Sequence, residues 1–161
     1  MIGLISDTHD NTEAIKKAVK IFKDNRVDLV IHCGDLVCPL CLKLFDGLNV
    51  FIVRGNCDGE IPGLKKRLDE IKGHYFDNLG EVHLNDKQVA FTHGNDEMIL
   101  SKLIDSKRFN YVFHGHTHMK RDERVGKTRV INPGALFMPV AEKTIALLDI
   151  EKDKLQFVEV R

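Results

Sequence analysis

Three histidines lie within six residues in the segment FHGHTH, residues 113–118, at the end of an apolar run. Imidazole is the commonest metal ligand in proteins, and alternate residues of an extended segment face the same side. His116 and His118 can therefore face one metal site or two adjacent sites. A lone histidine near a strand end is more often a hydrogen-bonded structural residue, so the interpretation depends on what the rest of the chain supplies.

Four other apolar runs are followed by side chains that can also bind a metal ion through nitrogen or oxygen. SDTH follows IGLI, GD follows DLVIHC, GNCD follows NVFIVR, and HGN follows QVAFT. In open α/β sheets the ligand crevice lies at the carboxyl ends of the strands, so we expect these five loops to converge there. Glycines beside most of them allow sharp turns and a close approach of the backbone. The candidate metal ligands are Asp7, His9, Asp35, Asn56, His93, His116 and His118.

The types of donor indicate the kind of metal. Carboxylate, carboxamide and imidazole ligands without thiolate suit Mn²⁺, Fe, Co²⁺, Ni²⁺ or Zn²⁺ rather than a structural zinc site. Seven side chains are too many for one ion and suit two if one carboxylate bridges them. We therefore expect two divalent metal ions, with Mn²⁺ preferred. Two aspartates offset only part of their charge, so the site would attract anionic substrates such as phosphate esters.

The apolar pattern along the chain predicts an α/β fold with mixed sheets. Strands are expected at 2–6, 28–33, 49–53, 88–92 and 110–114. Helical spacing is expected at 12–25, with Asn11 as the N-cap, and at 39–45, 64–72 and 97–105. From about Met119 the pattern changes to two antiparallel hairpins, at 123–132 and 144–160, joined by the loop NPGALFMP.

Length and composition narrow the class of protein. A chain of 161 residues without a linker or repeat is expected to form a single domain, 1–161. Lysines and arginines number 24, as do aspartates and glutamates, so the zero net charge gives no sign of stable nucleic-acid binding. The first residues lack a basic region and no run reaches membrane-spanning length. We expect a cytoplasmic protein whose four cysteines are free thiols and which binds no membrane.

The ordered motifs SDTHD, GDL, GNCD, THG and GHTH resemble those of the calcineurin-like metallophosphoesterase superfamily. The short length and the NPG turn resemble its small bacterial and archaeal phosphodiesterase branch, and the likeness covers residues 2 to about 150. The resemblance implies a four-layer α/β/β/α sandwich and a phosphodiesterase that hydrolyses a small substrate with hydroxide activated by two metal ions. It also implies one ion held by Asp7, His9, Asp35 and His118, and another held by Asp35, Asn56, His93 and His116.

Cys57 stands where many members of this family have a histidine. The candidate catalytic residues are the ligands Asp35 and Asn56 together with Cys57, and the role of the cysteine is left open. A thiol with its usual pKa of about 8.5 is neutral at pH 7 and brings no positive charge to a phosphate. General-acid help is worth on the order of 10²–10⁴-fold, so we expect esters with poor leaving groups to react slowly unless a group such as Arg54 assists.

Three further residues beside the ligand motifs are candidates for supporting roles. Arg54 either assists at the phosphate or is a solvated surface residue, and Asp58 is expected to orient its own loop. Asn95 either lines the pocket or makes a turn. The remaining histidines are not expected to be ligands: His32 and His114 are placed in the core beside the site, and His74 and His83 at the surface.

Two alternative functions are open from the sequence. Cys38 and Cys41 form a C-x-x-C pair, which is typical of redox proteins but weak by itself. The phosphoesterase-like subunit of the retromer coat keeps this fold chiefly to bind proteins, so a scaffold is the second alternative. A complete set of coordinating side chains favours the enzyme over both. The pattern neither requires nor excludes a homo-oligomer.

Overall fold

The first half of the chain builds most of a six-stranded mixed sheet in the computed structural model, which describes residues 1–161. Its strand order is β11-β10-β1-β2-β3-β4. The strands β1 to β4 run parallel, whereas β10 is antiparallel to β1 and β11 is antiparallel to β10. The bounds are β1 (Ile2–Ile5), β2 (Leu29–His32), β3 (Val50–Val53), β4 (His74–Phe76), β10 (Thr144–Asp149) and β11 (Lys154–Glu159).

A second, five-stranded sheet has the order β5-β6-β7-β9-β8. Its three central strands, β6, β7 and β9, are parallel, and the edge strands β5 and β8 pair antiparallel with their neighbours. The bounds are β5 (Leu79–Leu84), β6 (Lys87–Thr92), β7 (Tyr111–Phe113), β8 (Lys120–Val125) and β9 (Thr128–Pro133). Both sheets are therefore mixed, as the sequence predicts.

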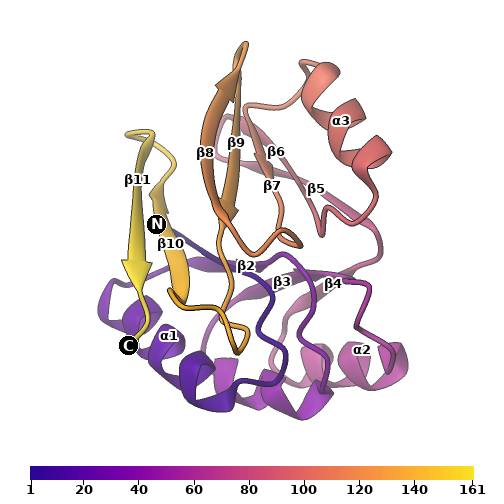
Figure 1. The fold of residues 1–161 in the computed structure, drawn as a ribbon, viewed down its shortest axis with the longest axis vertical. Coiled ribbons are helices and arrows are strands. Elements are labelled where there is room, and N and C mark those ends of the chain that lie inside the picture. Colours follow the sequence, from indigo (N-terminus) through magenta and orange to yellow (C-terminus); the bar gives the residue numbers. More distant parts are fainter.

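Helices cover the outer face of each sheet (Figure 1). The first sheet carries α1 (Thr12–Asp24), the 3₁₀ helix η1 (Pro39–Phe45) and α2 (Ile61–Glu70), and the second carries α3 (Glu97–Asp105). The α1 helix begins at the predicted cap, where the side chain of Asn11 accepts the backbone N–H of Ala14. Its buried face consists of Ala14, Ile15, Ala18, Val19 and Phe22. The expected four-layer α/β/β/α sandwich is confirmed.

Three groups of buried side chains hold the layers together. One joins the three helices of the first layer to the first sheet, and a small one joins α3 to the second sheet. Between them, the two sheets pack through residues such as Leu4, Ile31, Phe91 and Phe113, all of which are fully buried. Fully burying such a side chain contributes roughly 1.5–3 kcal/mol. The sheets therefore form a rigid support for the loops at their ends.

Most of the predicted elements are confirmed within a few residues; two begin earlier than predicted, and two strands were not predicted. The α2 helix begins at Ile61 rather than at 64, because Pro62 is tolerated in the first turn and Glu60 caps the backbone N–H of Gly63. The hairpin strand β8 begins at Lys120 rather than at 123. The strands β4 and β5 were not predicted. None of the helices combines the length and apolar character that a membrane crossing requires.

Candidate metal centre

The seven predicted ligand side chains meet where the ends of β1, β2 and β3 face the ends of β6 and β7. Oδ1 of Asp7 lies 3.3 Å from Nε2 of His118. Oδ2 of Asp35 lies 3.4 Å from Nε2 of His9 and 3.4 Å from Nε2 of His93. The loop after β1 thus contacts the loop after β7, and the loop after β2 contacts the loop after β6.

Asn56 and His116 complete the group on the side of His93. Oδ1 of Asn56 lies 3.0 Å from Nε2 of His93, and the rings of His93 and His116 are 5.1 Å apart, edge to face. Three sets of potential ligand atoms lie within 4.8 Å of one another: Asp7, His9 and His118; Asp7, Asp35 and His93; and His9, Asp35 and Cys57. The thiol of Cys57 therefore lies among the donors, although it was not predicted to be a ligand.

Five of these ligand residues have a left-handed backbone. The φ angle is 50° at Asp7, 38° at His9, 58° at Asp35, 66° at His116 and 58° at His118. Residues other than glycine adopt positive φ rarely, and backbone strain of this kind gathers at functional sites, where the surrounding structure enforces it. The pairs Asp7 with His9 and His116 with His118 therefore lie on left-handed turns and not on the extended segments that their spacing predicts.

Two glycines make room for the carboxylates. A Cβ atom added at Gly55 would overlap the carboxylate and backbone N of Asp35. A Cβ atom added at Gly115 would lie 2.6 Å from Oδ2 of Asp7 and would overlap the hydroxyl of Ser6. The same Asp7 oxygen accepts the backbone N–H of His116 at 3.0 Å. The GN and GH motifs thus need glycine because their backbones run directly against the ligand side chains.

The unsatisfied atoms of the site fit a cation. Oδ1 of Asp7 and Nε2 of His9 are buried and have no hydrogen-bond partner. Nδ1 of His93 faces the carbonyl of Cys33 at 2.8 Å, so this nitrogen carries the proton and donates it. The bare Nε2 of a neutral His93 then faces the oxygens of Asn56 and Asp35. Acceptors that converge without a proton between them are stabilised by a metal ion, and a histidine held by a backbone carbonyl is typical of metal sites.

The charges of the site are set by burial and by its hydrogen bonds. Burial raises the pKa of Asp7 above its ordinary value, against the smaller opposing effects of Ser6 and nearby histidines. Burial also opposes ionisation of Asp35, but a His93 ring that carries a second proton, on Nε2, can donate to this carboxylate; together with the backbone N–H of Cys57 it outweighs burial and holds the pKa of Asp35 low. The same contact with Asp35 raises the pKa of His93 despite its burial. Asp35 is therefore ionised at neutral pH.

Asp58 orients the loop that carries Asp35. Its buried carboxylate accepts the backbone N–H groups of Asp35 at 3.0 Å, Val37 at 2.7 Å and Gly55 at 2.8 Å. These bonds join the loops after β2 and β3, and they stabilise Val37 at a φ of 77°, which is unusual for a β-branched residue. The supporting role expected for Asp58 therefore has a clear geometric basis.

His32 joins the first two ligand loops. The backbone N–H of Gly34 donates to Nδ1 of His32, so Nε2 carries the proton and donates to the hydroxyl of Thr8 at 3.2 Å. That hydroxyl in turn donates to the carbonyl of Asp35. His32 is fully buried, and burial lowers its pKa to about 3. A neutral imidazole thus acts as a fixed link, in agreement with the expected core position.

Sequence reasoning missed two residues beside the ligands. The buried Asn132 donates to the carbonyl of Gly115 at 2.8 Å and to the hydroxyl of Thr117 at 3.1 Å, and so fixes the GHTH turn. The ring of Phe137 packs on His9 and His118, with centroids 4.4 and 5.3 Å away. Both belong to the NPGALFMP segment, which begins in β9 and continues as a loop. The sequence shows it only as a turn, because no pattern reveals that it folds back over the candidate ligands.

Cys57 lies at the exposed edge of the site. Its backbone N–H donates to Oδ1 of Asp35 at 2.8 Å, and Nδ2 of Asn56 lies 3.3 Å from its sulfur. Desolvation, followed by the nearby Asp35, raises the pKa of this thiol to about 11. The side chain is therefore neutral at pH 7, as expected from its type.

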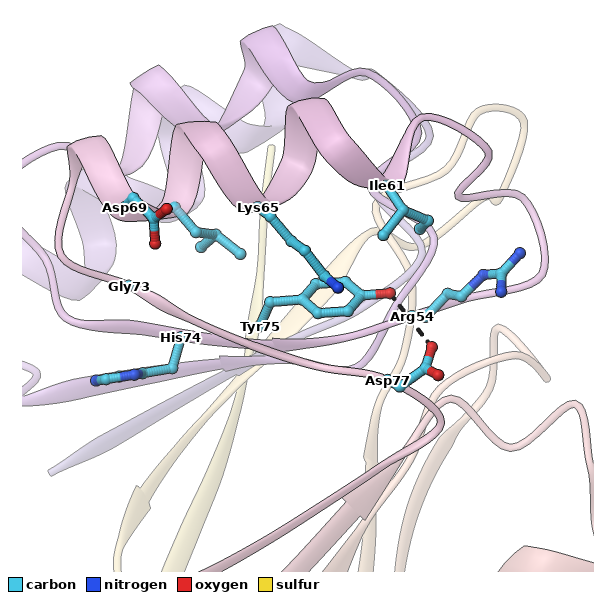
Figure 2. A pocket seen from close by; sticks show the side chains of 9 residues that line it. Arg54, Ile61, Lys65, Asp69, Gly73, His74, Tyr75 and Asp77 are labelled. Carbon is cyan, nitrogen blue, oxygen red and sulfur yellow. Dashed lines mark hydrogen bonds between the residues drawn. The ribbon is translucent and has the colours of Figure 1, made fainter.

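Two of the candidate supporting residues make no hydrogen bond or ion pair with the candidate ligands. Figure 2 shows the exposed Arg54 at the edge of a hollow between α2 and β4, which it lines together with Lys65, Tyr75 and Asp77. Asn95 is exposed and lines a shallow surface hollow with residues of α3. Both are near the site in sequence, but the structure gives neither a bond to the metal-binding side chains.

Comparison with known proteins agrees with this geometry. The family model of the calcineurin-like phosphoesterase superfamily domain matches residues 1–153. A phosphodiesterase of Methanocaldococcus jannaschii is 40% identical over 155 residues, which cover 94% of this chain and 93% of the relative. A solved archaeal phosphodiesterase superposes with a TM-score of 0.93 at 37% identity, covering 98% of both chains.

More distant neighbours share the fold alone. Vacuolar protein sorting 29 of Cryptosporidium parvum has a TM-score of 0.63 at 17% identity, over 98% of this chain and 95% of its own. A likeness at that identity gives no support to the scaffold alternative. Because the family model covers nearly the whole chain and the phosphodiesterase relative is so similar, this chain belongs to the calcineurin-like phosphoesterase superfamily.

Proposed function

We propose that this protein is a metal-dependent phosphodiesterase that hydrolyses small phosphodiesters with two divalent metal ions. The observation that carries the proposal is the meeting of seven nitrogen and oxygen donors at the ends of five strands from two sheets. Family membership and the similarity to archaeal phosphodiesterases support the same reaction.

The contacts support the division of ligands that the family resemblance implies. Asp7, His9 and His118 would hold the first ion, and Asn56, His93 and His116 the second. Asp35 would bridge them, because its Oδ2 is equally distant from His9 and His93. Two divalent ions in such a site lower the pKa of a water molecule and neutralise phosphate oxygens. Mn²⁺ is the ion we prefer, since hard oxygen donors mixed with imidazole suit it.

The remaining residues would orient and shield the substrate. Phe137 covers the rings of His9 and His118 on one side, which restricts the direction from which a phosphate can approach. Cys57 lies at the open edge, where the leaving group would depart, and offers a neutral thiol. The net charge of zero gives the protein no overall attraction for a polynucleotide, so a small phosphodiester is the proposed substrate. We further propose one domain, 1–161, acting in the cytoplasm.

Metal replacement and substrate choice test the proposal together. Protein treated with a chelator should lose turnover of a bis-aryl phosphodiester, and Mn²⁺ or Ni²⁺ should restore it. A phosphomonoester and a cyclic nucleotide, measured in parallel, define the substrate class. His116→Ala should bind less metal and turn over poorly, whereas His83→Ala, at an exposed position, should behave as the wild type. Hydrolysis at an undiminished rate without metal would contradict the proposal.

A further inference from the structure

We propose that Cys38 and Cys41 form a reversible intramolecular disulfide by exchange with low-molecular-weight disulfides, at a site separate from the metal centre. Cys38 is the N-cap of η1, and the backbone N–H of Cys41 donates to its carbonyl at 3.0 Å. A 3₁₀ turn closed in this way rises about 2 Å per residue, so its first and last Cα atoms lie about 6 Å apart. Disulfides span Cα separations of about 4.4–6.8 Å, so the backbone already brings the two cysteines to bridging distance.

Asp10 fixes both cysteines from the neighbouring loop. Its Oδ1 accepts the backbone N–H of Cys38 at 2.7 Å and the thiol of Cys41 at 3.5 Å. Pro39 restricts the backbone at the first position of the helix. One carboxylate oxygen therefore holds the two ends of the C-x-x-C turn, and the side chains do not depend on a flexible loop for their positions.

The two thiols differ in access, as the two steps of an exchange require. Cys38 is half-buried and Cys41 is buried. Both line a hollow of about 400 Å³, together with Leu40, whose side chain is 56% exposed, and other residues of α1 and η1. A small disulfide can therefore reach Cys38, whereas Cys41 is sheltered. Burial, with Asp10 next in effect, raises the pKa of Cys41 to about 12, so this thiol is protonated at neutral pH and reacts poorly with external reagents. Its attack on the Cys38 sulfur depends on the proximity that the turn imposes.

The other two cysteines provide a contrast inside the same molecule. Cys33 is fully buried within the core, and Cys57 is exposed at the edge of the metal centre. Neither belongs to a C-x-x-C turn. The phosphodiesterase reaction uses neither Cys38 nor Cys41, so the pair forms a second site, which the proposed function does not explain.

The exchange is balanced without any other reactant. The thiolate of Cys38 attacks one sulfur of a disulfide RSSR, the S–S bond breaks, and the first RS⁻ leaves and takes up the proton that Cys38 lost. Cys41 then loses its proton, attacks the Cys38 sulfur of the mixed disulfide, and expels the second RS⁻, which becomes RSH. The protein loses two protons and two electrons, and RSSR takes them up and is reduced to two RSH. Reduced thiols in excess reverse both steps.

Glutathione redox buffers and peptide mapping test this proposal on the metal-loaded protein. Trypsin cleavage after Arg26 and Lys43 places Cys33, Cys38 and Cys41 on one peptide, and cleavage after Arg54 and Lys65 places Cys57 on another. As the ratio of oxidised to reduced glutathione rises, the first peptide should lose two hydrogens and retain one alkylatable thiol, Cys33. Dithiothreitol should restore all three. Any adduct on Cys57 is read separately on its own peptide.

Single variants separate the two steps. Cys41→Ser should accumulate a stable glutathione adduct on Cys38, since serine cannot resolve it, whereas Cys38→Ser should leave Cys41 unmodified. Serine is close in size to cysteine; at position 41 its hydroxyl can donate to Asp10, and at position 38 the bond to Asp10 comes from the backbone N–H, so both variants should fold. Peptide mapping of the wild-type protein tests the disulfide even if a variant does not fold. A lasting glutathione adduct on wild-type Cys38, or no reaction at either thiol across the series, would overturn the proposal.

Discussion

Oδ2 of Asp35 lies 3.4 Å from Nε2 of His93, so one carboxylate joins the end of β2 in the first sheet to the end of β6 in the second. The same oxygen is as close to Nε2 of His9, while Oδ1 accepts the backbone N–H of Cys57. Asp35 therefore faces three loops at once. This central position is the physical reason for assigning it the bridging role between two metal ions.

If Asp35 bridges the ions, its removal should harm both metal positions. Asp35→Asn keeps the size of the side chain but loses the charge that two cations would share. We expect the metal content to fall at both positions and turnover of an aryl phosphodiester to fall by at least about 10²-fold. Metal analysis and activity are compared with Asp69→Asn, at an exposed aspartate on α2. Two bound ions with normal turnover in Asp35→Asn would refute the bridge.

The backbone at Gly115 should not tolerate a side chain. In Gly115→Ala the new methyl group would overlap Ser6 and press on Oδ2 of Asp7, so the loop has to move away from β1. Overpacking of this kind typically costs 1–3 kcal/mol, and we expect reduced metal affinity together with lower stability to urea. Gly59→Ala is the matched control, because a Cβ atom there meets nothing within 4 Å. Equal metal affinity in the two variants would contradict this account of the GH turn.

The sequence carried enough information to predict that the candidate ligand side chains converge, but not what surrounds them. Their convergence could be predicted because side chains such as Asp7 and His93 follow short apolar runs, and parallel strands bring such ends together. The strand β4 was missed because it has only three residues at a sheet edge, and β5 because its exposed face interrupts the apolar pattern. Neither strand positions a ligand directly.

Long-range contacts explain the remaining omissions. Asn132, at the end of β9, acts on the GHTH turn, and Phe137, in the loop that follows, acts on the DTH turn; nothing local to either residue indicates its target. Arg54 shows the opposite case. It is adjacent to the GNCD motif in sequence, yet its side chain lines the hollow between α2 and β4 and not the candidate metal centre (Figure 2). Position beside a motif therefore does not establish contact with the site.

Because of His32, the metal-free protein should be less stable in mild acid than at neutral pH. Burial lowers its pKa in the folded protein to about 3, whereas an unfolded chain has a histidine pKa of about 6.5. Between these values the unfolded chain binds a proton that the folded protein excludes, so the free energy of unfolding decreases as the pH falls. The slope from this one group approaches about 1.4 kcal/mol per pH unit.

Urea unfolding at several pH values between 7 and 4, in the presence of a chelator, measures this effect. His32→Asn is the informative variant, because its carboxamide oxygen can accept the N–H of Gly34 but cannot titrate. It should be less stable than the wild type at pH 7 and should show a shallower decrease in acid. Parallel pH profiles for the two proteins would mean that other groups, and not His32, determine the acid sensitivity.

Cys57 should limit the range of substrates through leaving-group chemistry rather than through metal binding. Its neutral thiol lies at the edge of the site and brings no positive charge to a departing oxygen. Turnover should therefore fall steeply as the pKa of the leaving group rises across a series of aryl phosphodiesters. An imidazole of ordinary pKa, about 6.5, can supply a proton near neutral pH, so Cys57→His should flatten that dependence without changing the metal content.

Cys57→Ala separates this explanation from a direct role of the sulfur. The backbone N–H of residue 57 still donates to Asp35 in the alanine variant, so the carboxylate keeps its orientation and both ions should remain bound. Because a good leaving group needs little protonation, Cys57→Ala should hydrolyse the most activated aryl ester within a few-fold of the wild-type rate. The decisive measurement is that rate together with the metal content of the same sample. If Cys57→Ala binds both ions but is inactive on the activated ester, the thiol itself takes part in catalysis, and the leaving-group explanation fails.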